Sequence, residues 1–140
     1  MLSTAEYAIV VQCEIVKQRC SGFLCEHAFT HRIDCFAEYA GNEDLRFLPI
    51  SCGGCCGRAT LRKLQHAVKL LKQKENISTD QIVVHLASCV AFESHHGPEC
   101  PHKEYLSKIV SEKVGLRLVY GTRLSPRTEA RRKSGLYPSR

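Results

Sequence analysis

The sequence lacks the features that would place a chain in a membrane or carry it across one. No apolar run approaches the roughly 18–20 residues that a membrane-spanning helix requires. The N-terminal segment has no basic residues before its short apolar run, so the pattern of a secretion signal is missing. The 140 residues are 44% hydrophobic, which excludes a disordered chain. We therefore expect a folded cytoplasmic protein without membrane contact.

Most of the chain also lacks an excess of either charge. The net charge is +6, but residues 123–140 hold six basic residues and one acidic residue, so the remainder is nearly neutral. This end contains Pro126, Gly135 and Pro138 and has no apolar period, which indicates a flexible tail over residues 124–140. Such a run is usually a solvated end of the chain. Any binding of nucleic acid would depend on this tail alone.

Four short apolar runs alternate with three helical patterns. The runs cover residues 7–13, 45–52, 81–89 and 116–122. They are nearly continuous in Val, Ile and Leu, as is typical of strands that are covered on both faces. Pro49 in the second run indicates an edge strand, because proline cannot donate a hydrogen bond to a neighbour. The helical patterns cover residues 23–40, 57–75 and 101–114.

This β-α-β-α-β-α-β order predicts an α/β fold. We expect a three-layer domain with a small, mostly parallel four-stranded sheet, flavodoxin-like or related, and with right-handed crossovers. The domain should span residues 1–123, followed by the basic tail. The sequence does not predict the oligomeric state.

Cysteine is the abundant residue, with nine in the chain. Disulfides are not expected in a reducing compartment, and an odd number cannot pair completely within one chain. The composition therefore indicates metal binding or thiol chemistry. Three expected strands end in cysteine, at the edge where open parallel sheets bind ligands, and the following loops add five more. The eight cysteines at this edge are Cys13, Cys20, Cys25, Cys52, Cys55, Cys56, Cys89 and Cys100.

The ninth cysteine, Cys35, falls ten or more residues into the first expected helix, away from this edge. We interpret it as a buried apolar residue, which is a common role of free cysteine.

The most specific motif is Cys52-Gly53-Gly54-Cys55-Cys56-Gly57, between a strand and a helix. A C-x2-C pair brings two sulfurs close enough to share a metal or to form a disulfide. The glycines allow left-handed backbone angles and close approach to a ligand. The N-terminus of the following helix favours a thiolate.

At these residues the chain resembles the CGGC-domain family of small prokaryotic proteins, which are described as metal-binding. The resemblance covers roughly residues 7–123 and implies metal binding, with no defined reaction. Two positions differ from the family pattern: Cys56 stands where members often have proline, and Arg123 where histidine commonly follows the final Gly-Thr. The matching features are Cys13, the Cys20 and Cys25 pair, Cys52-Gly53-Gly54-Cys55, His85-Leu86-Ala87-Ser88-Cys89, Cys100-Pro101 and Gly121-Thr122.

Setting Cys56 aside, seven cysteines are candidate metal ligands, more than the four that structural zinc or an iron–sulfur cluster needs. Thiolates suit both, so ligand type does not decide between them. The surplus of thiols and the glycine-rich loop favour a redox-active iron–sulfur cluster, which would serve a redox partner protein, with zinc as the alternative. The candidate ligands are Cys13, Cys20, Cys25, Cys52, Cys55, Cys89 and Cys100.

Two other functions stay open. A thiol–disulfide or sulfur-transfer enzyme would use Cys52 or Cys55 as a nucleophile of low pKa. An anion or nucleotide binder would use the glycine loop and the helix terminus, but the chain has no GxGxxG or P-loop pattern, which makes this the weakest hypothesis.

The histidines are secondary candidates. On a strand, His85 and Cys89 would be separated by about 13 Å, so they cannot share a metal, and His85 is expected in the core with a hydrogen-bond partner. His27 and His31 match Cys35 in helical spacing but suit a solvated helix face. The reserve ligands are His95, His96 and His102, which flank Cys100.

Overall fold

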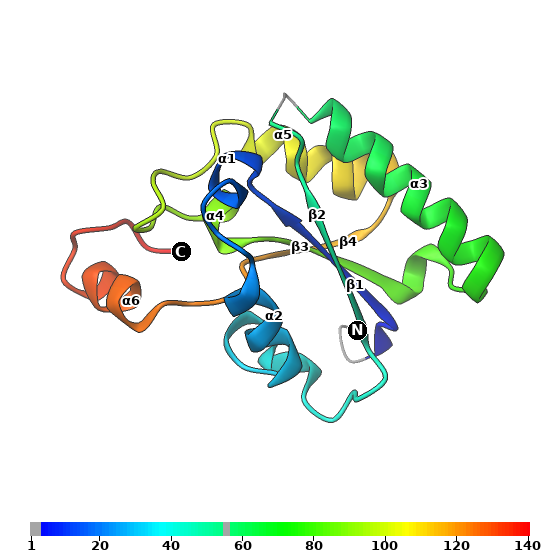
Figure 1. The fold of residues 1–140 in the computed structure, drawn as a ribbon, viewed down its shortest axis with the longest axis horizontal. Coiled ribbons are helices and arrows are strands. Elements are labelled where there is room, and N and C mark those ends of the chain that lie inside the picture. Colours follow the sequence, from blue (N-terminus) through cyan, green and yellow to red (C-terminus); the bar gives the residue numbers. More distant parts are fainter. Residues whose placement is uncertain (1–3, 55–56) are drawn as a thin grey trace.

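The computed structural model describes residues 4–54 and 57–140, and its centre is a four-stranded parallel sheet (Figure 1). The strand order is β2-β1-β3-β4. β1 and β3 are buried along their whole length, because both of their faces are covered by helices. The strands are β1 (Tyr7–Gln12), β2 (Arg46–Ser51), β3 (Ile82–Leu86) and β4 (Arg117–Tyr120).

The edge position of β2 confirms the prediction made from Pro49. Pro49 pairs with Val10 of β1 on its inner side. Because β2 is the edge strand of the described sheet, the missing N–H of proline leaves no acceptor of the sheet unpaired.

Helices cover both faces of the sheet and confirm the three-layer α/β prediction (Figure 1). On one face lie α3 (Arg58–Glu75), α5 (Lys103–Lys108) and the π-helical continuation η4 (Ile109–Val114). They pack on Ile9, Val11 and the other strand residues whose side chains point to that face of the sheet. On the other face α2 (Phe23–Thr30) and the 3₁₀ helix η2 (Asp34–Tyr39) pack on Ala8 and Val10.

The single helix expected over residues 23–40 is wrong, because the chain turns between α2 and η2. Arg32 and Asp34 adopt left-handed backbone angles, with φ of 53° and 55°, which end an α-helix. The guanidinium of Arg32 holds the turn by donating to the carbonyl oxygens of Phe29 and Asn42.

The third strand is shorter than expected, and this moves Cys89 off the sheet. β3 ends at Leu86, and Cys89 lies in the short helix α4 (Ser88–Ala91). The backbone N–H groups of Val90 and Ala91 donate to the carbonyl oxygen of Ala87 at 2.8 and 2.9 Å. These bonds turn the chain directly after the strand.

Three further helices complete the chain: α1 (Glu14–Lys17), η3 (Thr79–Gln81) and α6 (Pro126–Lys133). α6 lies in the basic tail, where no helix was expected from the sequence. It begins with the cap Ser125 and with Pro126 in the first turn, and Thr128 is buried. In the described part of the chain, no helix is long and apolar enough to cross a membrane.

Candidate functional site

The carboxyl ends of β1 and β3 form the point where the sheet order reverses. From β1 the chain passes outward to β2, then returns to β3 on the other side of β1. In doubly wound sheets the crevice at such a point binds ligands. Cys13 directly follows β1, and Cys89 lies three residues after β3. The fold therefore brings two of the predicted ligands to the expected position.

Four thiols at this edge pack on the core of the α3 face. One of them, Cys89, also packs on the core of the opposite face, so we call the other three, Cys13, Cys52 and Cys100, the α3-side thiols. All three pack with the apolar core between the sheet and α3. Burial raises the pKa of Cys100, and the nearby thiols of Cys52 and Cys13 raise it further. A backbone N–H from His102 partly offsets this increase. The α3-side thiols therefore lie close enough to interact electrostatically.

Cys52 is held where β2 ends. Its side chain is buried, at 8% exposure, and the backbone N–H of Glu14 donates to its Sγ at 3.4 Å. The Thr60 hydroxyl at the start of α3 donates to the Cys52 carbonyl at 3.2 Å. After Cys52, Gly53 and Gly54 adopt positive φ, as expected from the motif. Cys55 and Cys56 lie outside the described residues, so the predicted pairing of Cys52 with Cys55 stays a prediction.

Three other thiols line a cavity, and we call Cys20, Cys25 and Cys89 the cavity thiols. Burial raises the pKa of Cys89 to about 12, with smaller increases from Cys13, Cys25 and Cys20. A hydrogen bond from the Cys13 backbone partly offsets these effects. Cys89 therefore neighbours both Cys13 and the other two cavity thiols, and it links the two groups.

Thr122 and Ser88 join the ends of β3 and β4 beside these thiols, and the sequence analysis did not identify their role. The Thr122 hydroxyl lies 3.2 Å from Cys25 Sγ and accepts a hydrogen bond from the Ser88 backbone at 3.3 Å. In return, the Ser88 hydroxyl accepts from the Thr122 N–H at 3.0 Å and donates to the Arg123 carbonyl at 2.7 Å. Both residues belong to motifs used above only for the family resemblance, which is the signal that could have identified them.

Cys35 corrects a sequence prediction, because it also reaches this edge of the sheet. Its N–H donates to the Thr122 carbonyl at 3.1 Å. A Cβ at Gly121, where φ is +101°, would lie 2.6 Å from Cys35 Sγ and 2.8 Å from Phe92 Cε2. Burial raises the pKa of Cys35 to about 11, although Arg140 lowers it slightly. Cys35 was expected elsewhere because a continuous helix over 23–40 would have carried it away.

His85 confirms the prediction of a core histidine. It is fully buried, its Nε2 lies 2.7 Å from the Tyr39 hydroxyl, and its Nδ1 lies 2.8 Å from the Gly121 carbonyl. Burial lowers its pKa to about 4. With both ring nitrogens engaged, His85 is a structural residue that ties β3 to η2 and β4.

The other histidines separate into two places. His95 and His96 line the cavity with the cavity thiols, whereas His102 is exposed and does not line it. Burial lowers the pKa of His96, and the charges of His95, Arg19 and Arg123 lower it further. The ring centroids of His27 and His31 lie 4.3 Å apart, with the rings tilted by 50°, near the end of α2, which stops before Cys35.

The donor set fits a soft metal, because thiolates bind zinc and iron–sulfur clusters. The raised pKa values of Cys89 and Cys100 mean that these thiols stay protonated until a metal displaces their protons. Among residues 4–54 and 57–140, no group of three or more His, Cys, Asp or Glu side chains stands ready to hold a metal ion. The ligand set therefore remains a prediction.

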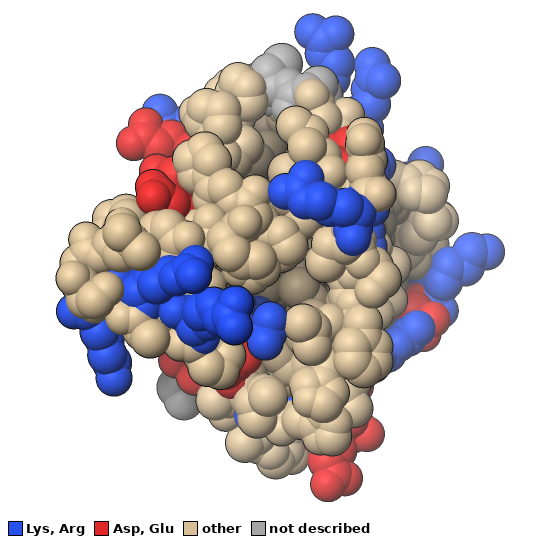
Figure 2. Space-filling view, turned by 60° about the vertical axis from the view of Figure 1, so that its left-hand side comes forward, with Lys and Arg blue, Asp and Glu red and all other residues tan. Residues whose placement is uncertain are grey.

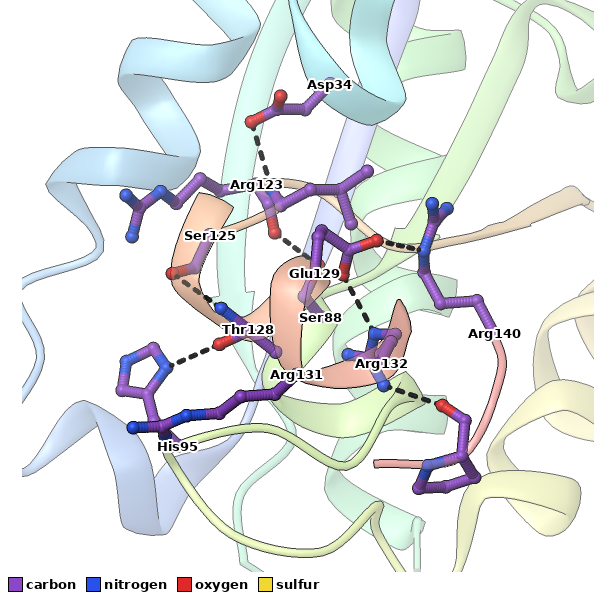
Figure 3. A network of polar contacts seen from close by, with 12 residues as sticks. Asp34, Ser88, His95, Arg123, Ser125, Thr128, Glu129, Arg131, Arg132 and Arg140 are labelled. Atoms are coloured by element: carbon purple, nitrogen blue, oxygen red, sulfur yellow. Dashed lines mark hydrogen bonds and ion pairs between the residues drawn. The ribbon is translucent and has the colours of Figure 1, made fainter. Parts of the chain in front are cut away.

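α6 contributes Thr128, Glu129 and Arg132 to the lining of the cavity. Figure 3 shows Glu129 at the centre of a polar network there, paired with Arg132 and Arg140, each at 2.8 Å. The Thr128 hydroxyl lies 3.2 Å from His95 Nδ1. Asp34 of η2 accepts from the Leu124 N–H at 2.9 Å and so fixes the chain that leads into α6.

Comparison with known proteins gives one match. No curated protein and no solved structure was found to be similar to the chain. The family model of the CGGC domain matches residues 7–123, which include all four strands, every described cysteine and the helices on both faces, while α6 lies outside it. Because this match covers most of the sequence, the chain belongs to the CGGC-domain family.

Proposed function

We propose that the protein binds a metal through cysteine thiolates at the carboxyl ends of its strands. Membership of the CGGC-domain family suggests metal binding in general. The ligands that we favour are Cys13, Cys52, Cys55 and Cys89, while Cys20, Cys25 and Cys100 complete or guard the site.

The observation that carries this proposal is the packing of four thiols on one core at the carboxyl edge of the sheet: Cys13, Cys52, Cys89 and Cys100. The thiols of Cys52 and Cys13 raise the pKa of Cys100, and the thiol of Cys13 also raises that of Cys89. Burying several thiols together at the crevice of an α/β sheet is difficult to explain by apolar packing alone. A metal would stabilise the ionised forms of these thiols and offset the repulsion between neighbouring thiolates.

We favour an iron–sulfur cluster over zinc, since seven candidate thiols exceed the four that either needs. When bound, a cluster would supply one-electron redox chemistry. The chain's own part is to provide thiolates and to limit access of water, which the buried position of Cys52 serves. A redox partner protein would then be required.

The test is metal analysis and a visible absorption spectrum of protein purified without oxygen. We expect tightly retained metal, with broad visible absorption that is lost on oxidation if the metal is an iron–sulfur cluster. A colourless protein with one retained zinc would support metal binding and reject the cluster. Cys52→Ser combined with Cys89→Ser should abolish retention, whereas Cys35→Ser should leave it unchanged. Protein without bound metal would contradict the proposal.

A thiol–disulfide or sulfur-transfer enzyme is the second candidate, and the surroundings of Cys52 favour it. The Glu14 N–H donates to Cys52 Sγ, and the 18-residue helix α3 begins shortly after the motif. Backbone N–H donors and helix N-termini are found beside reactive cysteines in general. In metal-free, folded protein this function predicts rapid labelling of one thiol at neutral pH, and slow, uniform labelling would eliminate it.

A further inference from the structure

The cavity beside the thiols has the properties of a small-molecule site. It lies between the loops after β1, β3 and β4 and the tail helix α6, with a volume of about 80 Å³. Figure 2 shows a hollow on this face of the molecule with lysine and arginine side chains beside it. Val16, Leu24 and Leu124 contribute apolar lining.

One residue of the cavity lining carries a buried polar atom without a partner. Gln12, the last residue of β1, lines the cavity and is 3% exposed. In the described part of the chain, no group forms a hydrogen bond with its Oε1. Leaving a buried acceptor unpaired costs about 1–3 kcal/mol, so buried polar atoms nearly always have a partner. A ligand that donates a hydrogen bond would supply the missing partner.

The space next to Gln12 is kept open by a glycine. A Cβ at Gly22 would lie 2.9 Å from Lys17 Nζ and 3.0 Å from Gln12 Nε2. The ammonium group and the amide therefore face the same small space. Lys17 already donates to the Ser21 carbonyl at 3.0 Å, and this neutral acceptor leaves its charge uncompensated.

The charge that lines the cavity is positive. Glu129 is the carboxylate of the lining, and it is already shared between Arg132 and Arg140. Within residues 4–54 and 57–140, neither Lys17 nor Arg123 forms an ion pair. Figure 3 shows the Arg123 side chain extending away from the Glu129 carboxylate. Burial lowers the pKa of His96, and Arg123 is among the charges that lower it further, so Arg123 acts on the part of the cavity that His96 lines.

We propose that this cavity binds a short-chain hydroxy acid, whose carboxylate meets Lys17 and Arg123 and whose hydroxyl donates to Gln12. A hydroxyl fits better than an ammonium group, because the lining is already positive. The volume matches roughly five to eight non-hydrogen atoms, if each occupies the space of one water. The apolar side chains would contact the short carbon chain.

The site combines the family domain with the part of this chain that lies outside the family match. Gln12, Lys17 and Arg123 fall within residues 7–123, but Leu124, Thr128 and Arg132 lie beyond them. The tail helix thus closes a cavity that the family domain alone would leave open. This inference does not depend on the metal.

The experiment is a calorimetric titration of the full-length protein, purified without oxygen, with L-lactate as the probe. Propionate lacks the hydroxyl, and inorganic phosphate tests for an anion site without a carbon chain. We expect saturable binding of lactate in the millimolar range and at least fivefold weaker binding of propionate and phosphate. Arg123→Gln should weaken lactate binding about tenfold, as loss of a charge-assisted hydrogen bond does.

Gln12→Met keeps the length of the side chain and removes the acceptor. It should weaken lactate binding about fivefold, leave propionate binding unchanged and not lower thermal stability. Arg62→Gln, on the exposed face of α3, also removes one positive charge and should leave lactate binding unchanged. Absence of saturable lactate binding would overturn the proposal. Equal binding of all three anions, insensitive to Gln12→Met, would overturn it as well.

The same samples are assayed for metal, which separates this proposal from the proposed function. None of the three variants removes a thiol, so their metal content should equal that of the unaltered protein. Lactate binding by protein that retains no metal would reject metal binding and leave the hydroxy-acid site intact. Metal retention without lactate binding would reject the hydroxy-acid site and leave the proposal of metal binding intact.

Discussion

The α3-side thiols and the cavity thiols occupy the same edge of the sheet but differ in their surroundings. Cys52 is buried against α3, and Cys13 and Cys100 pack with the same core. Cys20 and Cys25 line a cavity that the basic tail closes. We propose that the two surroundings serve different roles: Cys13 and Cys52 would hold a metal together with Cys89, which lies between the two groups, and the cavity would bind a small molecule.

The largest expected effect separates the two groups by their metal content. Cys13→Ser with Cys52→Ser should remove nearly all bound metal, because it deletes two favoured ligands together. Cys20→Ser with Cys25→Ser should leave most of the metal, as these two thiols are not among the four favoured ligands. Elemental analysis of protein purified without oxygen measures the metal content of both double variants. Equal losses in the two double variants would show that the groups form one site.

The second prediction concerns stability in acid, which depends on the buried residue His85. The pKa of His85 is lowered to about 4 in the folded protein from 6.5. Between these values the unfolded chain takes up a proton that the folded protein does not, so stability falls as the pH decreases. The free energy of unfolding should drop by about 3 kcal/mol from pH 7 to pH 4 through this residue.

Urea denaturation at several pH values measures this effect. His85→Gln should lower stability at pH 7, where the ring has two hydrogen-bond partners, and should flatten the pH dependence over this range. His102→Gln, at an exposed position, should leave the curve unchanged. If His85→Gln left the pH dependence of the free energy of unfolding unchanged, other groups would cause the loss of stability in acid.

The third prediction tests how closely Cys35 and Phe92 pack at the end of β4. Gly121→Ala should destabilise the protein by about 3 kcal/mol, since the new methyl group would overlap both side chains at a positive φ. Gly41→Ala, at a similar φ of +89° with nothing within 4 Å, should cost only about 1 kcal/mol. Thermal denaturation measures both. Similar losses would mean that backbone strain, rather than packing, requires glycine at position 121.

The smallest effect is a difference in labelling rate within metal-free, folded protein. Cys89 and Cys35 should react slowest with iodoacetamide, because burial raises their pKa values to about 12 and about 11. Cys20, which is partly exposed at the cavity, should react faster. Mass spectrometry of digested protein at successive times gives the order. Preferential labelling of Cys89 would contradict its burial.

Much of the fold follows from local patterns. The apolar runs and helix periods predicted all four strands and α3, and Pro49 predicted the edge strand, because covered strands and amphipathic helices have distinct apolar spacings. The break after α2 was missed, since the left-handed angles at Arg32 and Asp34 have no strong signal in residues of that type. α6 was missed because a polar, basic segment without an apolar period forms a helix only when its neighbours hold it.

The sequence by itself determined that thiols gather at the carboxyl edge of a parallel sheet, because strand ends and loop order fix that edge. Only the tertiary structure decided how the thiols divide into the α3-side thiols and the cavity thiols. Residues distant in sequence become neighbours there: Cys100 approaches Cys52 and Cys13, while Cys35 reaches Gly121. The division depends on which face of the sheet each loop crosses and on where α6 packs, and such long-range contacts are set by burial of the whole chain.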